Sequence, residues 1–184
     1  MTSAVPSIVP SIMPLGPQHD ISEFHSSRPA LDTWLRDRAR RNQESADSRT
    51  FVITDDGRQV TGYYALTTSA AARVGLPGAL RRNAPVPVSL LLLGQLAVDL
   101  NSQGQGLGRA LLRDACLRTL SVLQHAGFRA LAAHPLDETA ETFYCRYGFS
   151  PIPDSQPRLL VLPVRRLQAA FAAAAQPAEI AQRS

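Results

Sequence analysis

Residues 90–115 constrain the fold of this chain more than any other stretch does. They read as an apolar strand, a glycine-rich turn and the start of an amphipathic helix. The turn contains three glycines, Gly104, Gly106 and Gly108. Without side chains, these residues can adopt backbone conformations with positive φ, and they let a ligand approach the backbone closely. The first N–H groups of a helix have no partner inside it and lie at its positive end. The stretch therefore predicts an anion site, most naturally for a phosphate or diphosphate.

The spacing of residues in this loop shows which known phosphate-binding motif it matches. A P-loop needs a lysine after its last glycine, and the chain contains no lysine. A dinucleotide fingerprint needs G-x-G-x-x-G, but Arg109 and Leu111 stand three residues after Gly106 and Gly108. The loop instead reads Gln-x-x-Gly-x-Gly, starting at Gln103, after a strand that ends in Ala-Val-Asp. This pattern resembles the acetyl-coenzyme A diphosphate loop of the GNAT-fold N-acetyltransferases, and an ordinary flexible turn is the alternative for the loop taken alone.

Length and composition favour one globular domain. The chain has 184 residues, and no apolar run approaches the length of a membrane span. Residues 1–17 lack the basic region of a signal peptide and contain several prolines, so we expect a cytoplasmic protein without membrane contact. Cys116 and Cys145 have no metal-ligand spacing, and we expect no metal.

The distribution of charge predicts a polyanionic partner. Every basic residue apart from histidine is an arginine, a bias that the codon usage of a GC-rich genome also explains. No carboxylate lies between Gly57 and Val98, although four arginines do, and residues 28–49 hold six arginines against four acids. Arginine suits bidentate contacts with phosphate.

The order of the expected elements is that of an α/β fold with a mixed central sheet of six to seven strands and about four helices. After a mobile Pro/Ser-rich arm, we expect an edge strand at 11–15, a capped helical turn at 20–24, and a helix that begins at Pro29 and has Trp34 in the core. The remaining expectations are strands at 49–53 and 60–67, a stretch at 69–88 that is mostly loop, a strand to 98, a helix at 106–126, a strand at 128–134, a helix at 137–147, strands at 149–152 and 158–164, and a helix at 165–175 before a frayed tail.

Several further stretches resemble one branch of that superfamily, the GNAT-fold toxins of bacterial toxin–antitoxin systems, which acetylate aminoacyl-tRNA. They lie at residues 19–24, 31–35, 48–52, 62–66, 81–85, 93–99 and 142–149. The resemblance implies a GNAT domain over residues 14–164, preceded by a flexible arm at 1–13 and followed by a C-terminal helix and tail at 165–184. The chain departs from the pattern at Ser26-Ser27, where a Cys-Gly-type pair is common, and at Pro135.

The resemblance also implies the roles of the site residues. The backbone of Leu96, Ala97 and Val98 would bind the pantetheine arm of acetyl-CoA, and Tyr144 would be the general acid that protonates the leaving thiolate. A core aromatic is the alternative for Tyr144. The diphosphate would be held by Gln103, Gly104, Gln105, Gly106, Leu107, Gly108 and Arg109. The implied partners are aminoacyl-tRNA and a small antitoxin of the ribbon–helix–helix kind, and a homodimer is left open.

The chemistry of acetyl transfer suits these residue types. An α-amine has a pKa of roughly 7.7–8.0, so a strong protein base is not demanded, and the sequence shows no obvious His/Glu pair. His134, at a strand end, is either a structural residue or one that positions substrate. The candidates for tRNA phosphates are Arg40, Arg41, Arg49, Arg81 and Arg82. Two other functions stay open: acetylation of a small amine, peptide or protein N-terminus, and a binding module without catalysis.

Overall fold

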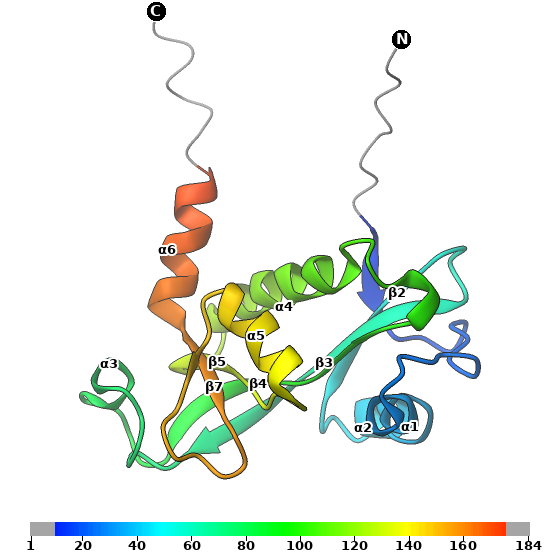
Figure 1. Ribbon diagram of the computed structural model, residues 1–184. Coiled ribbons are helices and arrows are strands. Elements are labelled where there is room, and N and C mark those ends of the chain that lie inside the picture. The colour runs from blue at the N-terminus through cyan, green and yellow to red at the C-terminus, as the bar shows by residue number, and fades with distance from the viewer. Residues whose placement is uncertain (1–9, 176–184) are drawn as a thin grey trace, which may run out of the picture. The chain divides into compact units, whose positions relative to one another are not determined.

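The strand, glycine loop and helix expected around residues 90–115 are all present in the computed structural model. They are β4 (Val88–Val98), the 3₁₀ turn η1 (Leu100–Ser102) and α4 (Leu107–Leu123), drawn in shades of green in Figure 1. The structure describes residues 10–175. The expected mobile arm, apart from residue 10, and the frayed tail lie outside the described residues. The chain divides into two units, and β3, β4 and α4 each contribute one part to either unit.

The first unit comprises the chain up to Leu66 together with Gln95–Ala115. Its antiparallel strands pair β1 with β2 and β2 with β3, so the expected edge strand and hairpin are confirmed. Its elements are β1 (Ile12–Pro14), α1 (Pro29–Asp37), α2 (Ala39–Glu44), β2 (Arg49–Thr54), the first part of β3 (Val60–Ala71), the end of β4, η1 and the start of α4.

The core of the first unit forms where α1 covers the sheet. Pro29 stands in the first turn of α1, where its missing N–H costs no hydrogen bond. Leu35 is fully buried with Phe24 and Tyr63, and Trp34 packs against this cluster with its ring stacked on Tyr63 at 5.9 Å between ring centroids. The expectation that Trp34 belongs to the core is confirmed.

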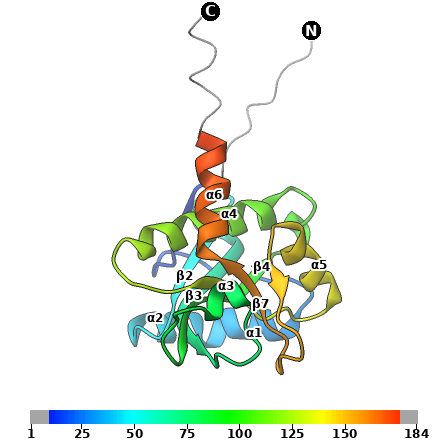
Figure 2. The same ribbon diagram turned by 90° about the vertical axis from the view of Figure 1, so that its left-hand side faces the viewer.

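The second unit comprises Thr67–Gly94 and the chain from Cys116 onward. In it β4 pairs with β5 in parallel, while β7 is antiparallel to both β5 and β6. β7 runs directly into α6, the orange to red segment of Figure 2. Besides the second parts of β3, β4 and α4, its elements are α3 (Gly78–Arg81), β5 (Ala130–Ala133), α5 (Glu138–Arg146), β6 (Ser150–Pro151), β7 (Leu160–Pro163) and α6 (Val164–Ala175). The strand order β1-β2-β3-β4-β5-β7-β6 confirms the mixed α/β sheet.

Two local expectations are wrong and one is confirmed. Residues 20–24 form no helical turn, because the Asp20 carboxylate accepts hydrogen bonds from both the N–H and the hydroxyl of Ser22 and closes a tighter turn. The stretch 69–88 is mostly loop, as expected, although β3 continues to Ala71 and α3 follows Pro77. The helix predicted from Pro29 is divided at Arg38 into α1 and α2, which brings the α-helices in the described part of the chain to six.

Candidate active site

The glycine loop of the first unit presents backbone N–H groups that the described chain leaves without acceptors. Asp99 caps η1 by accepting a hydrogen bond from the N–H of Asn101, which turns the chain out of β4. Gly104 and Gly106 then adopt φ values of +77° and +80°, in the left-handed region that favours glycine. None of the N–H groups of residues 104–109 donates to an acceptor in the described residues. An exposed row of free amides ahead of a helix suits a diphosphate.

Gln103 has a different part in this loop from its neighbours. Its side-chain Nε2 donates to the carbonyl oxygens of Ser26, at 3.2 Å, and Val98, at 3.1 Å. The amide therefore joins the loop to the end of β4 and to the segment before α1. The Gln103 side chain is thus used to hold the loop in position.

Close packing fixes the start of α4 against β3. A Cβ on Gly62 would lie 3.1 Å from the Cδ1 atom of Leu111 and 3.5 Å from the carbonyl oxygen of Ala97, so a larger residue here would require the Leu111 side chain to shift. Two residues along, the Tyr64 hydroxyl donates to the Asp114 carboxylate at 2.5 Å. The loop and its neighbours Leu96, Ala97 and Val98 all belong to the first unit.

Tyr144 lies in the second unit, on α5. As expected, Asp137 caps that helix through a hydrogen bond from the N–H of Ala140. The Tyr144 side chain is 6% exposed and packs against Phe143 and Phe149, at 5.4 and 5.3 Å between ring centroids. Burial raises the pKa of the Tyr144 phenol, and its hydroxyl has no hydrogen-bond partner among the described residues. The phenol is therefore protonated at neutral pH.

A buried phenol can protonate a thiolate if the thiolate is also in apolar surroundings. Burial penalises any anion, and in this chain it raises the pKa of the Cys116 thiol to about 12. A thiolate that forms in such surroundings is correspondingly more basic than in water. The raised phenol pKa of Tyr144 is therefore compatible with a general acid.

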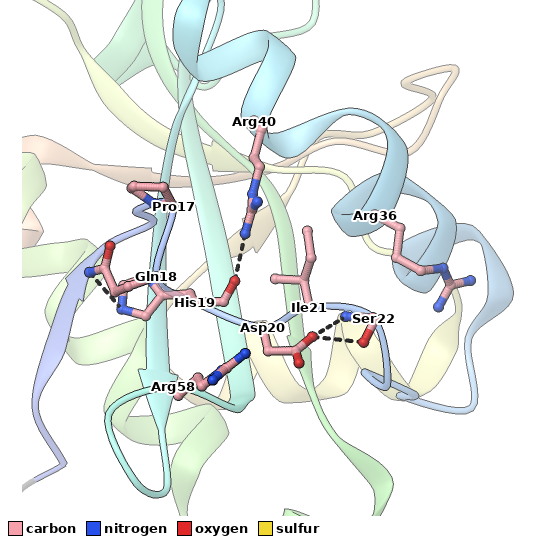
Figure 3. Close-up of a pocket in the computed structure, with 9 residues that line it drawn as sticks. All are labelled: Pro17, Gln18, His19, Asp20, Ile21, Ser22, Arg36, Arg40 and Arg58. Carbon is pink, nitrogen blue, oxygen red and sulfur yellow. Dashed lines mark hydrogen bonds between the residues drawn. The ribbon is translucent and has the colours of Figure 1, made fainter.

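The predicted RNA-binding arginines differ in how far the fold already uses them. Arg40 donates to the carbonyl oxygen of His19 and lines an open cavity of about 450 Å³ (Figure 3). Burial, and then the charge of Arg40, lower the pKa of His19. Arg41 is exposed, and the exposed Arg49 donates to the carbonyl oxygen of Gln43 at 2.9 Å. In the second unit, Arg81 and Arg82 are exposed at the end of α3.

Other expectations concern groups outside the loop. His134 follows β5, and its Nδ1 donates to the carbonyl oxygen of Arg158 at 2.7 Å. The described residues contain no group of three or more metal-ligating side chains. None of the helices in the described range is long and apolar enough to cross a membrane.

Sequence reasoning missed one polar cluster, at the N-terminal end of α1. Asp32 is buried and accepts hydrogen bonds from the N–H and hydroxyl of Ser26 and from the imidazole of His25. His25 and Asp32 stand seven residues apart across a turn and a helix start, a spacing that does not by itself indicate a contact. Only the fold brings them together.

The same turn explains why a glycine-type residue suits position 27. Ser27 has a φ of +67°, which costs a residue with a Cβ about 1–2 kcal/mol relative to glycine. We expect Ser27→Gly to stabilise the protein by up to about 1 kcal/mol, since the freer unfolded chain offsets part of the gain. In a chain of this size, that raises the thermal midpoint by roughly 2–4 °C in scanning calorimetry. A lower midpoint than that of the wild type would contradict this reading of the turn.

Comparison with known proteins decides which family this loop belongs to. The family model of the acetyltransferase (GNAT) domain matches residues 46–151, more than half of the chain. The chain is 43% identical over 143 residues to the tRNA-acetylating toxin of Mycobacterium tuberculosis (strain ATCC 25618 / H37Rv), an alignment that covers 78% of this chain and 86% of that protein.

The chain belongs to the GNAT acetyltransferases. Within that family it is a member of the tRNA-acetylating toxin branch. It is thus an N-acetyltransferase.

Solved structures of other GNAT toxins have the same fold. AtaT complexed with acetyl-methionyl-tRNA matches with a TM-score of 0.79 and 28% identity over 88% of this chain and 98% of that one. A tyrosine-to-phenylalanine variant of AtaT, bound to acetyl-CoA and to the C-terminus of the antitoxin AtaR, matches with a TM-score of 0.76 and 26% identity. That match covers 88% of this chain and 97% of that one.

Proposed function

We propose that this enzyme transfers the acetyl group of acetyl-CoA to the amino group of aminoacyl-tRNA and so blocks translation as the toxin of a toxin–antitoxin pair. The 43% identity to a tRNA-acetylating toxin over most of both chains carries this proposal. The acid-free arginine region between Gly57 and Val98 supports an RNA acceptor. Because charged tRNA is used in the cytoplasm, the activity would act there.

The described residues suggest how the chain would perform the transfer. The free amides of residues 104–109 would hold the coenzyme diphosphate, and the backbone of residues 96–98 would hold the pantetheine arm. The neutral amine attacks the thioester carbonyl, a C–N bond forms, and the C–S bond breaks with its electron pair on sulfur. Tyr144 would give that sulfur its proton. The same type of substitution, tyrosine to phenylalanine, is present in a solved structure of the relative AtaT, and in this chain it would test the role of Tyr144.

The acceptor can be identified directly. Purified protein is incubated with labelled acetyl-CoA, a set of charged tRNAs and a panel of free amines and peptides. We expect label on the charged tRNA, removed by hydrolysis of the aminoacyl ester. Label confined to free amines or peptides would instead support acetylation of a small amine, peptide or protein N-terminus.

Arg81 and Arg82 provide a test of the RNA surface. If both contact phosphates, Arg81→Ala/Arg82→Ala should weaken tRNA binding and lower the slope of log affinity against log salt by about 2. Arg165 and Arg166 of α6 are a matched pair of adjacent exposed arginines outside the predicted surface, and their double alanine variant should keep the slope. Equal slopes in wild type and in the Arg81/Arg82 variant would remove α3 from the RNA surface.

The remaining partners follow from the same proposal. Structures of the relative AtaT include its antitoxin AtaR, and we expect a small antitoxin of the ribbon–helix–helix kind for this chain. A homodimer is left open, and sedimentation would distinguish it from a monomer. The division into an arm at 1–13, a catalytic domain at 14–164 and a C-terminal segment at 165–184 likewise stays a prediction.

A further inference from the structure

The cluster around His25 lies next to the coenzyme loop in the first unit. The main-chain N–H of His25 donates to the Asp99 carboxylate at 3.0 Å, and its carbonyl accepts from the N–H of Leu100 at 2.8 Å. The carbonyl of the next residue, Ser26, accepts from Gln103. Residues 25 and 26 therefore run alongside residues 99–103. Residues 99–103 are the part of the chain that connects the strand predicted to bind pantetheine with the loop predicted to bind the diphosphate.

Asp32 fixes the imidazole of His25 in one tautomer. Burial works against the charge of Asp32, but the hydrogen bonds from Ser26 and His25 outweigh it, and the pKa of Asp32 is lowered. An ionised carboxylate can only accept hydrogen bonds, so the Nδ1 atom of His25, 3.0 Å away, carries the proton. In the neutral ring the Nε2 atom then has the free lone pair, the arrangement of a general base with an orienting acid.

The Nε2 atom of His25 is available to a substrate. The His25 side chain is 63% exposed, and its Nε2 atom has no partner in the described range. The charged groups around this segment are Asp32 at the imidazole, Asp99 at the His25 N–H, and Arg36, which donates to the carbonyl oxygen of Phe24. Both groups that contact His25 itself are carboxylates, one at its main-chain N–H and one at its imidazole.

We propose that His25 is a second catalytic residue of the acetyl transfer, the base that takes a proton from the ammonium group of the acceptor. This inference rests on the proposed function for the identity of that acceptor. His25 Nε2 removes one proton from the ammonium, and the freed lone pair attacks the thioester carbon. The exposed imidazolium then returns this proton to solvent. After the attack the nitrogen loses a second proton to solvent, and Tyr144, having given its own proton to sulfur, takes one back from solvent. These two transfers cancel, so each acetyl transfer releases one proton, the one that His25 removed.

The test measures kcat/KM for charged tRNA between pH 6 and 9.5 in wild type, His25→Gln and His25→Ala. Glutamine can still donate to Asp32 but is no base, which keeps the turn intact. We expect both variants to lose up to about 10-fold at pH 7, where only about a tenth of an amine with a pKa near 8 is neutral. The loss should shrink toward pH 9.5, where the amine is already neutral. Added imidazole should restore part of the rate of His25→Ala and none of the rate of His25→Gln.

Matched measurements separate catalysis from structure. His125→Ala removes an exposed histidine in the second unit and should leave the pH profile unchanged. Acetyl-CoA affinity and thermal midpoint should be similar in all variants. A loss that is equal at every pH, no loss at all, or a lack of rescue by imidazole would overturn the role of His25. If the wild type acetylates only free amines, the proposed RNA substrate is wrong, and the same comparison with that amine still decides the role of His25.

Discussion

Tyr144→Phe should lower kcat by about 10²- to 10⁴-fold, the usual contribution of a positioned general acid. The change removes one oxygen atom from a ring that otherwise keeps its contacts with Phe143 and Phe149. Because the hydroxyl makes no hydrogen bond to the described residues, fold and acetyl-CoA affinity should be unaffected. Rapid-mixing measurement of thiol release, with calorimetric titration of acetyl-CoA, checks both statements.

The pH profile adds a second readout for Tyr144. Since its pKa in the folded protein lies above the ordinary value of about 10, the phenol keeps its proton across the assay range. The wild-type rate should therefore rise as the acceptor amine loses its proton and should not fall again below about pH 10. Tyr63→Phe is the matched control, a buried tyrosine whose hydroxyl donates to the carbonyl oxygen of Leu31. It should cost stability without a specific loss of kcat, and an unchanged kcat in Tyr144→Phe would exclude the general-acid role.

Gly106→Asp should weaken acetyl-CoA binding by roughly 100-fold or more, because it sets a carboxylate beside the amides predicted to hold a diphosphate. A Cβ at Gly106 meets no atom within 4 Å, so the folded chain has room for the new side chain. The cost to folding arises from the φ of +80° alone. Calorimetric titration with acetyl-CoA and with desulfo-coenzyme A measures the affinity.

Gly57→Asp is the matched control for this loop. Gly57 has a φ of +83°, also meets no atom within 4 Å, and lies in the hairpin between β2 and β3. Both variants should lose similar stability, whereas only Gly106→Asp should lose coenzyme affinity. Equal affinities in the two variants would mean that the diphosphate does not bind at this loop.

The sequence predicted the elements whose signals are local. The pattern of residues 90–115 identified β4 and α4, Asp137 identified the start of α5, and the hairpin at Asp55-Asp56-Gly57 identified the pairing of β2 with β3. A local signal also misled the prediction at Arg38. The apolar spacing continues past this residue and predicts one helix, but the backbone leaves the helix there with a φ of −118°.

Long-range contacts could not be predicted in this way. Gln103 reads as a residue of the phosphate motif, yet its amide binds the carbonyl oxygen of Ser26, 77 residues earlier. His25 and Asp32 carry no motif, and their pairing depends on the turn at Ser27 and on the way α1 begins. Such side-chain contacts follow from the tertiary fold, and the sequence supplies only the residue types.

The double hydrogen bond of Gln103 has a consequence for the order of events in turnover. These two hydrogen bonds connect the glycine loop to the last residue of β4 and to the segment at 25–26, so the three segments are held together. A cosubstrate that binds to the loop would reduce the motion of all three segments before the acceptor binds. We therefore expect sequential, compulsory-order kinetics in which the thioester enters first and the bulky nucleic acid second.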